Sequence, residues 1–213
     1  MNGSRQKVRR RLPALALAFM VSACTGLPFD KPPPQLFVLT PKTTFPQDLP
    51  TVDWQMSVDL PIAQASLNTP RVAVHHTPIS LDYYQGAAWV DAAPKMVQTL
   101  LIESFESTGR ILGVGRQSVA LRADYNLVTE LREFQAELNH GEFPLIRVRL
   151  NAKLVRFPQR IIVATTSKEV VTQARGHQIE DIVRAFDESL GGVLKSVVTW
   201  TLRAVPARSP PRR

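Results

Sequence analysis

Cysteine is nearly absent from this chain of 213 residues, since Cys24 is the only one. A single cysteine cannot form an internal disulfide, so we expect a fold without a covalent cross-link. Long apolar runs are lacking too. The apolar stretch of residues 12–22 is about 11 residues long, whereas a transmembrane helix needs roughly 20. The two absences exclude a disulfide-stabilised scaffold and argue against a membrane-spanning helix in this stretch.

Motifs of common catalytic and metal sites are missing as well. The sequence contains neither HExxH nor GxSxG. Residues 113–116 begin like a phosphate-binding loop but lack its third glycine and its Lys-Ser/Thr pair. His75 and His76 are neighbours on a segment that we expect to be extended, so their side chains point to opposite faces. We therefore predict no catalytic, metal-binding or cofactor-binding residues.

The first 23 residues have the composition of a secretory signal. Five cations without an acidic residue come first, followed by the apolar stretch and a small-residue site, Val21-Ser22-Ala23-Cys24. These four residues resemble the lipobox of bacterial lipoproteins. The resemblance implies cleavage before Cys24, with a diacylglycerol on its sulfur and an acyl chain on its amine, so that the protein is held on a membrane. Thr25, in place of aspartate, implies sorting to the outer membrane.

The net charge of +8 is concentrated at the two ends of the chain. Without the five cations of the leader and the four of the tail, the chain's 26 basic side chains fall to 17, against 18 acidic ones. The middle of the chain is thus close to neutral, and we predict no nucleic-acid partner.

Composition divides the remaining chain into three parts. Residues 24–34 are rich in proline and read as an extended tether. Residues 35–202 contain no low-complexity segment and no repeat, and can form one domain with a substantial core. Residues 203–213 are rich in proline and arginine, and we expect this tail to be disordered.

Hydrophobic periodicity predicts the elements of the domain. We expect a helix with Asp91 as N-cap and Gly109 just past its end, and a closing helix over residues 179–200 that Gly191 and Gly192 weaken. A bulge near Arg132 explains why the apolar face changes within its strand. The expected strands cover residues 36–39, 54–60, 71–74, 81–84, 111–114, 126–137, 145–157 and 161–171, the last two forming a hairpin. The predicted fold class is α/β, a single domain in which two main helices cover a mixed β-sheet.

Two groups of side chains are candidates for contact with a partner. Arg147 and Arg149 lie with Lys153 on one face of the strand over residues 145–157. They either bind anionic headgroups or an acidic partner, or pair with Glu130 and Glu133 of the neighbouring strand, which we favour. Tyr83 and Tyr84 precede Trp89. We expect Trp89 in the core, whereas the tyrosines fit the core and a contact surface equally well.

The order of several motifs resembles one known family. Residues 67–74, then 81–84 and 88–91, lead as a strand, a tyrosine-containing stretch and a tryptophan into the first long helix. Together with the strands over 36–39, 131–134 and 145–148 and the closing helix, this pattern resembles the ABC-type transport auxiliary lipoproteins over residues 35–200. The resemblance implies a fold similar to the N-terminal domain of TolB.

The resemblance also implies a function and a partner. The protein would be a periplasm-facing accessory of an MCE-type ABC transport system. It would dock an MCE-domain protein at the outer membrane for the transfer of lipids or other hydrophobic molecules, with Tyr83, Tyr84, Arg147 and Arg149 as candidate contacts. The alternative is a structural or regulatory outer-membrane lipoprotein, either an activator of peptidoglycan synthases or an envelope assembly factor. The sequence leaves the number of copies open, a homo-oligomer included.

Overall fold

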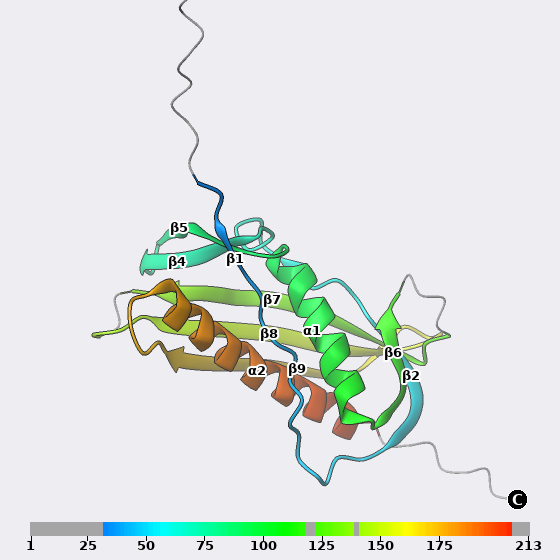
Figure 1. The fold of residues 1–213 in the computed structure, drawn as a ribbon. Helices are drawn as coiled ribbons and strands as arrows, with labels where there is room; N and C mark the ends of the chain where they lie inside the picture. The colour runs from blue at the N-terminus through cyan, green and yellow to red at the C-terminus, as the bar shows by residue number, and fades with distance from the viewer. Residues whose placement is uncertain (1–31, 118–121, 139–140, 206–213) are drawn as a thin grey trace, which may run out of the picture. The chain divides into compact units, whose positions relative to one another are not determined.

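The structure, a computed structural model, describes residues 32–117, 122–138 and 141–205 (Figure 1). The signal, Cys24, most of the tether and residues 206–213 lie outside the described residues, so the predictions made for them stay predictions. Within the described parts the chain forms nine strands, which make one mixed sheet, and two helices, which form a layer on one face of that sheet (Figure 1). The predicted fold class is confirmed.

The centre of the sheet is β7 (Tyr125–Glu137), because it pairs with four other strands. On one side it runs antiparallel to β8 (Leu145–Arg156), which pairs in turn with β9 (Ile161–Gln173), the predicted hairpin. On the other side three strands share its length in parallel: β2 (Val52–Val58), β3 (Ile62–Ala63) and β4 (Arg71–Thr77). The remaining three strands continue the sheet outward on this side. β6 (Ile111–Arg116) pairs with β2, β5 (Ser80–Trp89) pairs with β4, and β1 (Gln35–Phe37) pairs with β5.

The bulge predicted near Arg132 is present in β7. The pairing steps from Leu131 opposite Leu150 to Glu133 opposite Arg149, so Arg132 is the extra residue. Because side chains alternate along a strand, one extra residue returns Phe134 to the buried face. Phe134 then packs with Trp89 and Phe186, with ring centroids 5.0 to 5.7 Å apart. Trp89 is fully buried in this cluster, as expected from the sequence.

The first helix, α1 (Ala93–Thr108), begins later than the sequence suggested. Its N-cap is Ala92, without a side-chain cap, rather than Asp91. The Asp91 carboxylate instead accepts a hydrogen bond from the Ala92 amide at 2.8 Å and pairs with Lys95 at 2.7 Å. The hydrogen bond from Lys95 lowers the pKa of Asp91. Gly109 closes the helix in the left-handed region, with φ of 59°, as predicted.

The second helix, α2 (Ile179–Ala204), runs four residues further than predicted and buries one apolar stripe against β8 and β9. Its glycine pair has a packing role. A Cβ added at Gly192 would lie 3.0 Å from Cγ2 of Val170 in β9, whereas at Gly191 the nearest atom would be Cδ of Lys42 at 3.9 Å. Gly192 therefore lets the helix approach the sheet closely. Neither helix in the described part of the chain is both long and apolar enough to span a membrane.

Residues 38–49, here called the strap, run between α1 and α2 on the same side of the sheet (Figure 1). Leu39 and Leu49 are buried. The backbone amide and hydroxyl of Thr40 donate hydrogen bonds of 2.6 to 3.0 Å to the Asp187 carboxylate of α2. On the other side, the Lys42 amide donates to the Ser104 hydroxyl of α1 at 2.9 Å. The strand predicted at residues 36–39 therefore ends at Phe37, because the chain leaves the sheet there and buries Leu39 between the two helices.

Candidate functional site

The face of the sheet away from the helices carries the candidate contact residues. The inner residues of β7 and β8 are apolar and buried, and the alternate residues point to the other side, here called the outer face. Arg147, Arg149 and Lys153 all belong to this outer face, as the alternation in the sequence predicted. The question is therefore what neutralises them.

Arg147 is the centre of an ion-pair cluster. Its Nε donates to Oε1 of Glu137 at 2.7 Å and its Nη2 to Oε2 at 3.2 Å, which is a bidentate contact. Its Nη1 also donates to the Glu169 carboxylate of β9. The hydrogen bond with Glu137, supplemented by that with Glu169, raises the pKa of Arg147 above its usual range. The guanidinium is thus permanently charged and held from both neighbouring strands.

Arg149 continues the cluster toward the middle of the sheet. Its Nη2 donates to Oε1 of Glu133 at 2.6 Å, and the other oxygen of Glu133 lies 3.7 Å from Nε of Arg147. Pairing with Glu133 agrees with the interpretation favoured from the sequence. Pairing with Glu130 does not occur: Glu130 lies opposite Asn151 and forms its ion pair with Arg132 at 2.8 Å.

Three carboxylates thus face two guanidinium groups in the cluster of Glu133, Glu137, Glu169, Arg147 and Arg149. The outer face therefore carries charges of both signs, in agreement with the pairing favoured from the sequence over a uniformly basic strand face. A hollow of about 280 Å³ lies beside it. Its lining consists of Arg147, Glu133 and Glu137 of the cluster, Gln135 of β7, and His75, Thr77 and Pro78 of the β4–β5 hairpin. That volume is at the lower limit for a small-molecule site, so the outer face is better suited to contact with a surface.

The two tyrosines are both half-buried and packed against the core. The Tyr83 hydroxyl donates to the Ser66 carbonyl at 3.1 Å, and the Arg71 guanidinium lies 3.6 Å from the centroid of the Tyr83 ring. The Tyr84 hydroxyl is buried and has no hydrogen-bond partner among the described residues. Its burial raises the pKa of Tyr84 to about 12. Both rings are therefore held in place, and their role in a contact stays a prediction.

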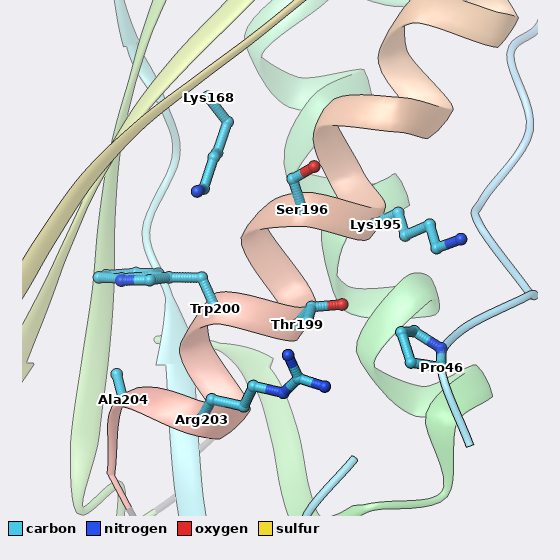
Figure 2. Close-up of a pocket in the computed structure, with 8 residues that line it drawn as sticks. All are labelled: Pro46, Lys168, Lys195, Ser196, Thr199, Trp200, Arg203 and Ala204. Carbon is cyan, nitrogen blue, oxygen red and sulfur yellow. The ribbon is translucent and has the colours of Figure 1, made fainter. Parts of the chain in front are cut away.

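A second hollow, of about 520 Å³, lies along the C-terminal half of α2 (Figure 2). Lys168 of β9 and Trp200 lie on one side of the helix, with Lys195 and Pro46 of the strap on the other. Arg203 pairs with Asp48 at 2.7 Å. The sequence did not indicate this basic hollow, because its cations come from separate elements and only the fold brings them together. No group of three or more His, Cys, Asp or Glu side chains in the described ranges is placed to hold a metal ion.

Comparison with known proteins decides the family. The model of the ABC-type transport auxiliary lipoprotein component matches residues 36–198, which is the sheet apart from Gln35 and most of α2. The chain belongs to this family. The assignment confirms the resemblance seen in the sequence.

Individual relatives agree with the family. Over 160 residues, 73% of this chain, it is 30% identical to the uncharacterized protein bll6063 of Bradyrhizobium diazoefficiens, but it spans only 41% of that protein. The crystal structure of protein XCC0632 from Xanthomonas campestris is similar with a TM-score of 0.76 and 29% identity, covering 80% of this chain and 95% of that one. A further crystal structure, of an uncharacterized protein, has a TM-score of 0.60 at 10% identity and covers 78% of this chain and 97% of its own, which is a likeness of fold alone.

Proposed function

We propose that this protein is the lipid-anchored accessory of an MCE-type ABC transport system. It holds the periplasmic assembly of the transporter at the outer membrane, where lipids or other hydrophobic molecules pass between the membranes. Family membership over residues 36–198 supports the transport role. The lipobox-like sequence ending in Cys24 supports the anchor, and Thr25 supports the outer membrane. In this proposal the protein positions its partner and performs no catalysis.

The observation that carries the docking role is the strap. Ten residues separate Cys24 from Gln35, the first residue of β1. An extended, proline-rich segment of that length spans roughly 30 Å, at about 3 Å per residue. Beyond β1 the chain is fixed at once by the contacts of Thr40 and Lys42 with the two helices. The domain therefore stays close to its anchor, and movement between them is confined to the short tether.

The contact surface in this proposal is the outer face. Tyr83, Arg147 and Arg149 present a rigid aromatic side chain and fixed charges to an MCE-domain protein, with Tyr84 supporting them in β5. Aromatic and arginine side chains dominate the energetics of many protein interfaces. Because the cluster contains both signs of charge, the matching surface should alternate in charge as well.

Photo-crosslinking in cells tests the proposal. Benzoylphenylalanine in place of Tyr83, in the intact lipidated protein, should capture an MCE-domain protein. The matched control places the same group at Lys195, which is exposed on α2 on the other side of the sheet. Capture of a penicillin-binding protein from position 83, and never of an MCE protein, would replace this proposal by the envelope-regulator alternative.

A further inference from the structure

Three aliphatic side chains are exposed together at the β1 edge of the sheet. Leu36 is 60% exposed, Val38 65% and Val90 50%. Strand β1 pairs in parallel with the end of β5, with Leu36 beside Ala88, and the Val90 amide donates to the Phe37 carbonyl at 3.1 Å. This pairing places Val38 beside Val90. Leu36, Val38 and Val90 are called the edge patch below.

The exposure of the edge patch follows from the alternation of the strands. Phe37 lies between Leu36 and Val38, and Trp89 directly precedes Val90. Both of these aromatic side chains pack against the core, so the patch side chains point the other way. Arg71 of β4 lies in the same cross-strand row, since it pairs with Ala88 as Leu36 does. The row therefore runs from aliphatic side chains at the sheet edge to a cation. Grouped apolar side chains with a polar rim mark an interaction site more often than scattered ones do.

The position of the patch in the chain identifies what covers it. Leu36 follows Cys24 by 12 residues, and a fully extended segment of that length reaches at most roughly 40 Å. If the acyl chains on Cys24 are in a bilayer, the edge patch belongs to the part of the domain held nearest to that bilayer. Aliphatic side chains with an arginine two strands away in the same cross-strand row suit the boundary between headgroups and acyl chains, because the stem of an arginine is apolar and its head is charged.

We propose that the edge patch rests on the membrane that holds the lipid anchor, with Leu36, Val38 and Val90 in the headgroup region. This inference rests on the proposed lipidation of Cys24. The anchor keeps the protein on the membrane, and the patch sets the orientation of the domain. The β1 edge then faces the lipid, and β9, at the opposite edge of the sheet, faces away from it.

A fluorescent label on the full lipidated protein tests this orientation. Because Cys24 is the only cysteine and its sulfur would carry the diacylglycerol, Val38→Cys supplies the one thiol open to an environment-sensitive dye. The matched control is Ile162→Cys on β9, an aliphatic position of similar exposure, 52%. Both proteins are reconstituted into vesicles of phosphatidylethanolamine and phosphatidylglycerol. Flotation of the vesicles first shows whether the protein is anchored.

The expected result is that both proteins float and that only the dye at position 38 reports the bilayer. Its emission shifts to the blue, spin-labelled lipid quenches it, and iodide in the water does not. Adding Leu36→Asp and Val90→Asp should return that emission to the aqueous value without releasing the protein from the vesicles, since two acyl chains hold it stably. If both proteins float and the two dyes behave alike, the edge patch does not touch the membrane and the inference is wrong. If neither protein floats, the anchor itself is wrong, and the proposed function fails with it.

Discussion

Alanine at the two adjacent glycines of α2 should have opposite effects on stability. Alanine is favoured over glycine by about 1 kcal/mol inside a helix. At Gly191 the new methyl group meets nothing closer than Cδ of Lys42, at 3.9 Å, so Gly191→Ala should stabilise the fold by nearly that amount. At Gly192 the methyl group would lie 3.0 Å from Cγ2 and 3.4 Å from Cγ1 of Val170. Overpacking of this kind costs roughly 1–3 kcal/mol, which leaves Gly192→Ala destabilised by about 1 kcal/mol.

Thermal unfolding followed by circular dichroism measures the difference. For a domain of this size 1 kcal/mol shifts Tm by roughly 2–4 °C, so the two variants should melt about 4–8 °C apart. Val170→Ala removes both methyl groups that the new side chain would meet, and in a double-mutant cycle it should recover most of the loss at Gly192 but change nothing at Gly191. Equal rises of Tm for both alanine variants would show that α2 does not approach β9 as closely as described.

Three further predictions concern the ion-pair cluster, the buried hydroxyl and the anchor. Arg147→Ala removes the ion-pair partner of Glu137, which is only 13% exposed, and should lower the free energy of unfolding in urea by about 2 kcal/mol. The control Lys153→Ala, at an exposed position on the same strand, should change it by less than about 0.5 kcal/mol. Equal effects of the two variants would contradict the cluster. Tyr84 keeps its proton up to a pKa of about 12 in the fold, whereas an ordinary tyrosine ionises near 10. The stability due to its neutral form is therefore complete below pH 10 and is lost as the pH rises through 12. Tyr84→Phe should remove that part of the loss of stability at alkaline pH. Identical alkaline unfolding of the wild-type protein and the variant would refute the raised pKa. Cys24→Ser should fold but leave the membrane fraction, and full retention on membranes would exclude the lipid anchor.

Strong alternation explains which parts of the fold the sequence could predict. Strand β8 alternates between buried apolar and polar residues over almost its whole length, so its faces and its hairpin with β9 follow directly. The bulge at Arg132 was visible for the same reason, because a single extra residue changes the phase of an otherwise regular pattern. Trp89 was placed in the core correctly from its size and its position before α1.

The features that were missed have no local signal. Beyond Val38 and Leu39, which end the predicted strand, the apolar residues of the strap stand singly, as Phe45 and Leu49 do, so the segment becomes recognisable only once two helices enclose it. The N-cap at Ala92 was missed because Asp91 satisfies the usual preference but pairs with Lys95 instead. In the ion-pair cluster, the pairing of Arg149 with Glu133 followed from the predicted neighbouring strand. The bidentate contact of Arg147 with Glu137 depends on the exact register, which periodicity alone does not fix.

The strap also determines how a pulling force would pass through this protein. Tension on the tether arrives first at β1, three residues joined to β5 by a few hydrogen bonds, and then at Thr40, whose bonds to Asp187 tie it to α2. The sheet itself, with β7 paired on both edges, lies beyond these contacts. Under stretch between two membranes, β1 and the strap would peel away before the outer face is distorted. The domain would thereby gain reach while the outer face, the proposed contact surface, stays intact.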